Sequence, residues 1–129
     1  MPQIKIHDLR NESFSINGLK IMPIRVLHYK MEVFGFRIGD FTYITDANYI
    51  ASEEMDKVRG SKILVLNALR LEQHISHFTL AEAIEVAQNL NCQETYFTHI
   101  SHQLGLHQEV NQNLPDHISL AHDGLVLEL

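Results

Sequence analysis

The chain has 129 residues, of which 45% are hydrophobic and 20% are charged, a composition typical of one water-soluble globular domain. Ten Lys and Arg residues against 16 Asp and Glu residues give a net charge of −6, and the basic residues are scattered singly, so a nucleic-acid partner is not expected. The apolar runs are far shorter than the roughly 18 residues that a membrane-spanning helix needs, which excludes a membrane span in this sequence.

Alternating and β-branched segments predict that most of the chain is sheet. Two-residue turn signals at Gly39-Asp40 and Asp123-Gly124 predict antiparallel hairpins over Val33 to Thr45 and Ile118 to Leu129. Asn17-Gly18 is a third, weaker turn signal. The predicted strands are Gln3 to Leu9, Lys20 to Leu27, Val33 to Ile38, Phe41 to Thr45, Lys62 to Leu66, Thr95 to Thr98, Ile118 to Ala121 and Leu125 to Leu129.

Two helices are signalled by their caps. Thr79 and Glu82 form a capping box before a run of apolar residues at helical spacing, and Asn91 ends that helix. Ser52 is expected to cap a shorter helix that runs to Arg59, and a short helical stretch is expected over His107 to Asn113. The order of elements predicts an α/β or α+β fold, a single domain over residues 1–129 with a mixed sheet and helices on one face.

Four predicted strands end directly in a polar side chain that can bind a metal or form hydrogen bonds. These residues are His28, Asp46, Asn67 and His99. Ligands of open α/β sheets gather at the carboxyl ends of the strands, so the four side chains would converge if their strands are neighbours with suitable orientation.

Imidazole and carboxylate groups suit zinc, iron or manganese, and a carboxylate can bridge two ions about 4 Å apart. His28, Asp46 and His99 therefore form a candidate metal site, whereas Asn67 is expected to be a structural hydrogen-bonding residue. A single His or Asp after a strand is also common as an ordinary loop residue or helix cap. Both interpretations remain open at the level of these residues.

Two further histidine pairs, His74 with His77 and His99 with His102, have the spacing of one helical turn but fall in predicted loops. His77 stands just before the capping box, where unpaired backbone N–H groups would attract an anion. The alternative for His77 is a solvent-exposed loop residue. Cys92 has no neighbouring base and is expected to be a buried or incidental thiol, and its being the only cysteine favours a cytoplasmic location.

Several segments of the chain, in this order, resemble the C-terminal half of a metallo-β-lactamase-fold hydrolase. The resemblance covers about residues 20–129 and is nearest to the cyclic-phosphodiesterase branch associated with carbon-phosphorus lyase. The segments are Val26-Leu27-His28-Tyr29-Lys30, Gly35-Phe36-Arg37-Ile38, Tyr43-Ile44-Thr45-Asp46, Asn67-Ala68-Leu69-Arg70, Ser76-His77-Phe78-Thr79-Leu80, Thr98-His99-Ile100-Ser101-His102 and Asp123-Gly124.

The resemblance implies half of an αββα sandwich and a phosphodiesterase with two divalent ions, zinc or manganese, in the complete enzyme. It implies that His28 is a ligand of one metal, that Asp46 bridges both, and that His99 is a ligand of the other. His77 resembles the histidine that contacts the substrate phosphate and can assist as an acid.

The main signature of that family, His-x-His-x-Asp-His, does not occur in the chain. One interpretation is that the 129 residues are the C-terminal part of a longer metallo-hydrolase, with weak or no metal binding and no turnover alone. The other is a noncatalytic assembly or regulatory module that keeps the fold. Because one sheet of a two-sheet sandwich would have a bare inner face, we expect a homodimer or a complex with the missing half. The expected substrate of the complete enzyme is a small phosphodiester.

Overall fold

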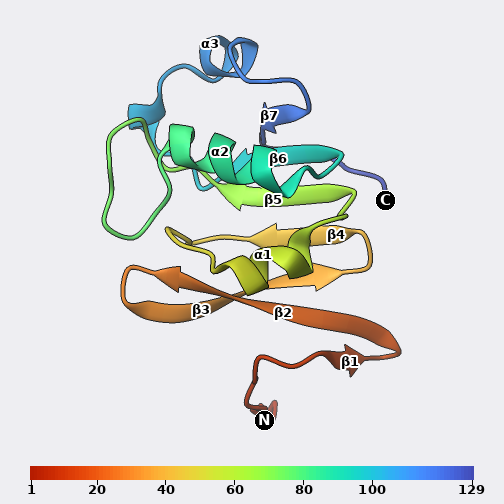
Figure 1. The fold of residues 1–129 in the computed structure, drawn as a ribbon. Coiled ribbons are helices and arrows are strands. Elements are labelled where there is room, and N and C mark those ends of the chain that lie inside the picture. Colours follow the sequence, from red (N-terminus) through yellow and green to blue (C-terminus); the bar gives the residue numbers. More distant parts are fainter.

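The computed structural model describes all 129 residues and contains one seven-stranded mixed sheet with its strands in chain order (Figure 1). This confirms the predicted mixed α/β architecture. The strands are β1 (Phe14–Ile16), β2 (Leu19–His28), β3 (Met31–Ile38), β4 (Phe41–Ile44), β5 (Ile63–Asn67), β6 (Glu94–Thr98) and β7 (Ile118–Leu120).

The first four strands are antiparallel neighbours, and β4 to β7 are parallel. The turn at Gly39-Asp40 joins β3 to β4 and confirms that hairpin. Asn17 and Gly18 both have positive φ (50° and 81°), as a two-residue hairpin turn requires, and join β2 to a short strand β1 that was not predicted. Because β2 and β4 are both antiparallel to β3, the ends of β2, β4, β5 and β6 lie at one edge of the sheet.

Three helices connect the parallel strands: α1 (Ser52–Val58), α2 (Leu80–Leu90) and α3 (His107–Gln112), with a 3₁₀ turn, η1 (His102–Leu104). The capping box of Thr79 with Glu82 is confirmed, and Asn91 ends α2 in the left-handed conformation. In α1 the prediction differs by one residue, because the extended Ala51 is the N-cap. The backbone carbonyl of Ala51 accepts the N–H groups of Glu54 and Met55, so the cap needs no Ser52 side chain.

All three helices pack on one face of the sheet, and α1 and α2 lie in front of it in Figure 1. The core between these layers contains Ile24, Ile44, Leu66 and Phe97, which are fully buried. The register places aromatic residues on the opposite face, which no helix covers. They are Phe34, Phe36, Phe41, Tyr43 and Tyr96, and we call them the open face.

Two predicted strands do not form. Residues 1–10 alternate in polarity but are exposed and have no neighbouring strand to bond with, so Gln3 to Leu9 is an arm without regular structure. The turn at Asp123-Gly124 is present, with the Leu125 N–H donating to the His122 carbonyl at 3.1 Å. Leu125 to Leu129 forms no strand and pairs with no neighbour. The predicted hairpin over Ile118 to Leu129 is therefore wrong, and only its first strand forms, as the three-residue β7.

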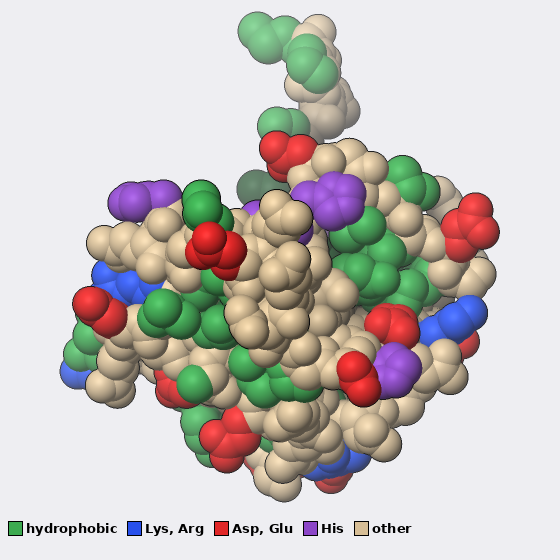
Figure 2. Space-filling view, turned by 90° about the horizontal axis from the view of Figure 1, so that it is seen from above, with side chains coloured by type: hydrophobic (Ala, Val, Ile, Leu, Met, Phe, Trp, Pro, Cys, Tyr) green, Lys and Arg blue, Asp and Glu red, His purple; other side chains and the backbone are tan.

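No helix is both long enough and apolar enough to cross a membrane. Viewed from above in Figure 2, the Lys and Arg side chains lie scattered around the rim of the molecule and do not gather into one patch.

Candidate metal centre

The four strand-end residues take up the positions that the sheet directions require. His28 is the last residue of β2 and Asn67 the last of β5, while His99 directly follows β6 and Asp46 lies two residues beyond β4. All four strands end at the same edge, so the predicted convergence at this edge is found.

The backbone at this edge is unusual. Asp46 and His99 have φ values of 60° and 58°, and Tyr29, next to His28, has 59°. The left-handed region costs a residue with a Cβ roughly 1–2 kcal/mol. Such conformations persist where the surrounding structure fixes them and are frequent at functional sites.

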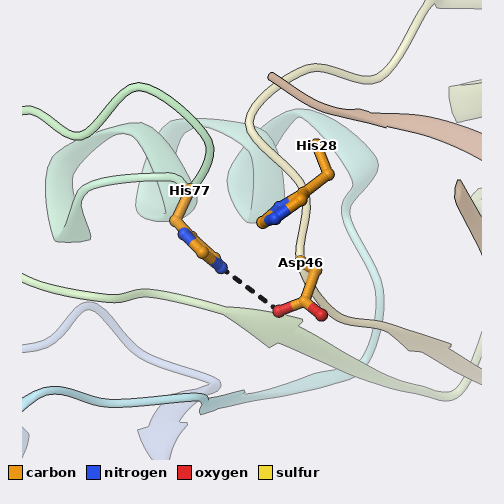
Figure 3. Close-up of side chains that lie close together, drawn as sticks. All are labelled: His28, Asp46 and His77. Atoms are coloured by element: carbon orange, nitrogen blue, oxygen red, sulfur yellow. Dashed lines mark hydrogen bonds and ion pairs between the residues drawn. The ribbon is translucent and has the colours of Figure 1, made fainter. Parts of the chain in front are cut away.

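His28, Asp46, His77 and His99 form what we call the strand-end cluster, and Figure 3 shows the first three of them. One oxygen of Asp46, Oδ1, lies 3.2 Å from Nε2 of His77 and 3.3 Å from Nε2 of His99. Potential ligand atoms of His28, Asp46 and His77 all lie within 4.8 Å of one another. The rings of His77 and His99 are stacked with centroids 4.7 Å apart, and the His28 ring meets the His77 ring edge-on.

The cluster combines buried and open groups. The side chain of His77 is only 11% exposed, whereas those of Asp46 and His99 are 45% and 43% exposed. Burial lowers the pKa of His77, although its contact with Asp46 acts in the opposite direction. The His77 ring is therefore held toward its neutral form, in which one nitrogen has a free lone pair.

These residues fit a divalent transition metal. Nδ1 of His28 is buried and has no hydrogen-bond partner, a condition that proteins rarely leave uncompensated. A carboxylate oxygen that faces two imidazole nitrogens is the donor set that zinc, iron and manganese prefer. Of these groups, only Nδ1 of His28 lacks a partner within the protein, and a bound ion would supply one.

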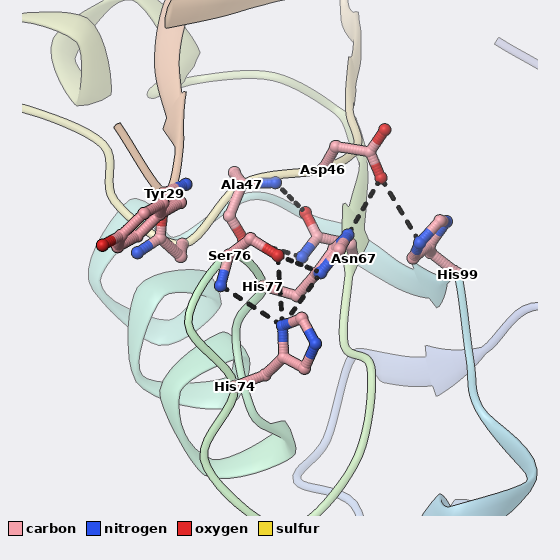
Figure 4. Close-up of polar contacts among 9 residues, drawn as sticks. Tyr29, Asp46, Ala47, Asn67, His74, Ser76, His77 and His99 are labelled. Atoms are coloured by element: carbon pink, nitrogen blue, oxygen red, sulfur yellow. Dashed lines mark hydrogen bonds and ion pairs between the residues drawn. The ribbon is translucent and has the colours of Figure 1, made fainter. Parts of the chain in front are cut away.

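Asn67 has the structural role expected from the sequence. Its fully buried side chain accepts the N–H of Ala47 at 2.9 Å and donates to the carbonyl of Ala47 at 2.8 Å (Figure 4). These two bonds fix the residue that follows Asp46, so Asn67 holds the loop on which the carboxylate lies.

The start of α2 differs from the expected anion site. The N–H groups of Phe78, Thr79 and Leu80 donate to the Ala47 carbonyl, the Glu82 carboxylate and the Arg70 carbonyl. Since these donors are satisfied inside the protein, they are not the unpaired N–H groups that the sequence interpretation placed beside His77. His77 is buried, which excludes the alternative of a solvent-exposed loop residue.

The loop before α2 contains a contact that sequence reasoning missed. His74 and His77 lie in a nonhelical loop, yet their Nδ1 atoms are 3.3 Å apart, and Ser76 Oγ contacts both. Serine in a loop has no periodicity that would single it out. The order His-x-Ser-His just before a capping box was the only available signal. His102, the other expected partner, is exposed in η1.

Comparison with known proteins gives three findings. Residues 2–100 match the family described as the beta-lactamase superfamily domain. The chain is 32% identical over 126 residues to an octanoyltransferase of Porphyromonas gingivalis (strain ATCC BAA-308 / W83), covering 96% of this chain and 26% of that protein. Among solved structures, the chain is similar to a new diphosphatase from the PhnP family, with 42% sequence identity and a TM-score of 0.95. The match covers 98% of this chain and 50% of that one.

A more distant structure, the metallo-beta-lactamase fold protein YhfI from Bacillus subtilis, has 18% identity and a TM-score of 0.74, covering 93% of this chain and 54% of that one. The chain therefore spans about half the length of these two solved structures and about a quarter of the longer Porphyromonas gingivalis relative.

Proposed function

The chain belongs to the beta-lactamase superfamily, and we propose that it forms the metal-binding C-terminal part of a hydrolase that cleaves phosphodiester or diphosphate bonds. The observation that carries the proposal is the Asp46 oxygen in contact with Nε2 of both His77 and His99, beside the unpartnered His28. The 42% identity to a diphosphatase supports a phosphoryl substrate. Octanoyl transfer is the activity of a protein of which this chain matches only 26%, and it is not part of the proposal.

In this proposal His28, Asp46 and His99 would hold divalent metal, zinc or manganese, in the complete enzyme, and Asp46 would be a ligand of both ions. A bound divalent ion supplies Lewis-acid polarisation of the phosphoryl oxygen and lowers the pKa of water. His77 touches the substrate phosphate and gives or takes a proton at Nε2, the ring atom that faces Asp46. Burial of His77 keeps bulk water from competing for this contact.

The isolated chain is proposed to be incomplete. It supplies two protein ligands for each of two ions, whereas catalytic zinc normally has three protein ligands and a water. We therefore expect at most one weakly held ion and no turnover. The open face, on which Tyr43 is 44% exposed, is the proposed contact with a missing N-terminal half or, failing that, with a second copy.

A fusion protein tests this function. The half of the PhnP-family diphosphatase that this chain does not cover is placed before residues 1–129, because the covered halves superpose closely. The fusion is expected to hydrolyse bis-p-nitrophenyl phosphate or a diphosphate only with added zinc or manganese, and His77→Ala is expected to lower turnover while metal content stays. The matched control His107→Ala changes an exposed histidine outside the cluster. A well-folded, metal-loaded fusion without turnover would contradict the proposal.

A noncatalytic assembly module is the second candidate, and the open face favours it, because Tyr43 is exposed there and the other aromatic residues are only half-buried. The DNA sequence directly upstream of this coding region distinguishes the two candidates. An in-frame His-x-His-x-Asp-His segment directly upstream supports the enzyme, whereas a start codon with no such segment supports the module.

A further inference from the structure

Asn48, in the loop after β4, joins two other loops of the sheet edge through its amide side chain. Its Oδ1 accepts the N–H of Tyr29, in the turn after β2, at 2.9 Å. Its Nδ2 donates to the carbonyl of Ile75, in the loop before α2, at 3.3 Å. The three joined segments carry the residues whose potential ligand atoms lie within 4.8 Å of one another: His28, Asp46 and His77.

The backbone of Asn48 is held independently of its side chain. Its N–H donates to the carbonyl of Leu27 at 2.9 Å, and the N–H of Leu27 donates to the carbonyl of Tyr49 at 3.0 Å. These bonds tie the loop after β4 to the end of β2, and the turn with Tyr29 and the loop with Ala47 lie side by side in Figure 4. The amide group of Asn48 is therefore presented from a fixed position.

The turn after β2 is strained and needs this support. Tyr29 and Lys30 form the two-residue turn between β2 and β3, and Tyr29 has a φ of 59°. Gly or Asn usually occupies such a position in a tight hairpin, because a larger side chain makes positive φ unfavourable. The bond from the Tyr29 N–H to Asn48 favours the strained form. His28 directly precedes Tyr29, so a relaxed turn would move its ring relative to the rest of the strand-end cluster.

The two contacts of Asn48 require both halves of an amide. The carbonyl oxygen accepts from Tyr29, and the amino group donates to Ile75. A carboxylate can make the first contact but not the second, and alanine can make neither. Variants at this position can therefore separate the two contacts.

We propose that Asn48 is a positioning residue that sets the geometry of the metal centre by holding the turn after His28 and the loop before His77 in place beside Asp46. It acts through these backbone segments and is not itself a metal ligand. The consequence for metal binding rests on the proposed function, whereas the hold on the two segments does not.

The first test is amide hydrogen exchange of the ¹⁵N-labelled chain without metal. Tyr29 is 50% exposed, so its N–H exchanges quickly unless it has a partner. Asn48→Ala should speed its exchange roughly fivefold, the equivalent of one hydrogen bond, whereas Asn48→Asp keeps the acceptor and should leave it slow. The matched control is Asn111→Ala, because Asn111 Oδ1 accepts the N–H of Leu120 at the same 2.9 Å, away from the cluster. It should speed exchange at Leu120 and not at Tyr29.

The second readout is zinc affinity, measured by competition with a chelator. Asn48→Ala should lower it roughly tenfold, the lower end of what outer hydrogen-bond partners of metal ligands contribute, and Asn111→Ala should leave it unchanged. Adding Tyr29→Gly to Asn48→Ala should restore part of the affinity, because glycine adopts positive φ without the support of Asn48.

The outcomes separate this inference from the proposed function. Exchange of the Tyr29 N–H in the unaltered chain at the rate of an unstructured peptide would overturn the inference without any variant. Unchanged Tyr29 exchange in a folded Asn48→Ala, or an equal loss of zinc affinity in Asn111→Ala, would also overturn it. Faster Tyr29 exchange in Asn48→Ala, in a chain that binds no zinc, would support the hold on the turn and reject the metal centre.

Discussion

Buried polar groups have hydrogen-bond partners on the helix-covered side of the sheet, whereas at the edge where β2, β4, β5 and β6 end one of them has none. Beneath α1, Thr42 Oγ1 and Ser61 Oγ lie 2.7 Å apart, and Ser61 donates to the Val58 carbonyl at 2.6 Å, so these buried hydroxyls are paired. At the edge, His28 Nδ1 is buried without a partner, and Asp46 adopts a strained φ of 60°. In proteins, unpaired buried polar groups and strained backbone are found mainly at residues that the function requires.

This contrast predicts that substitutions on the covered side change stability and leave metal binding intact, whereas substitutions at the edge do the reverse. Four substitutions test the separation.

The largest effect on stability is expected from Phe97→Ala on the covered side. Phe97 is fully buried between the sheet and the helices, and removing such a ring costs about 3–5 kcal/mol in the free energy of unfolding. Urea denaturation measures the loss. Zinc affinity of the molecules that remain folded should be unchanged, and a large fall in affinity would show that the two regions are not separable.

At the edge, Asp46→Asn should lower zinc affinity by about 100-fold or more, beyond the 10- to 100-fold that loss of an outer partner costs. Asn tolerates positive φ at least as well as Asp, so the free energy of unfolding should change little. Competition with a chromophoric chelator measures the affinity. Equal zinc binding by the variant would remove Asp46 from the metal site.

A smaller effect is expected from Glu54→Gln, which tests a buried charge on the covered side. Glu54 is 4% exposed, and its carboxylate accepts from Asn11 Nδ2, from the Arg25 N–H and from Lys57 Nζ at 2.8 Å. Loss of these charge-assisted bonds should cost roughly 1.5–3 kcal/mol at neutral pH, and urea denaturation measures it.

The cost of Glu54→Gln should depend on pH. Burial raises the pKa of Glu54, but the hydrogen bonds from Lys57, Asn11 and Arg25 outweigh it and leave the pKa below its ordinary value of 4.5. The charged form thus stabilises the fold above about pH 4.5, and this contribution is lost as the pH falls through the lowered pKa. The difference between wild type and variant should shrink under acid, and a difference that grows would contradict this account.

The smallest change in stability is expected from His28→Phe at the edge. Replacing a buried polar atom that has no partner by an apolar group of similar shape is nearly neutral or stabilising. Thermal unfolding should therefore occur within a few degrees of wild type or slightly higher, while zinc affinity falls. Marked destabilisation would show that His28 has a structural partner in solution.

Much of this arrangement could be predicted because it depends on short-range signals. The Thr79–Glu82 capping box and the Gly39-Asp40 turn act within a few residues, and strand ends at His28, Asp46 and His99 follow from apolar runs that stop. The failed strands, Gln3 to Leu9 and Leu125 to Leu129, have strand-like patterns, but a strand also requires a neighbour, which a local pattern does not reveal.

The loop from His74 to His77 could not be predicted for a related reason. Its contacts depend on an irregular backbone held by bonds to distant segments, such as the Phe78 N–H donating to Ala47 at 2.9 Å. These bonds hold the loop against the rest of the protein, which buries His77 and brings Ser76 Oγ into contact with its ring. Resemblance to a known family identified His77, but only the geometry brings His74 and Ser76 to its ring.

The most direct test of the metal centre is a zinc titration of the ¹⁵N-histidine-labelled chain followed by its imidazole signals. The chain has nine histidines, and those outside the strand-end cluster serve as internal controls. The account predicts that the signals of His28, His77 and His99 change together and saturate near one ion per chain, and that the exposed His107, His117 and His122 do not change. Zinc that leaves the cluster signals unmoved, or that saturates the exposed histidines first, would contradict a metal centre at this edge of the sheet.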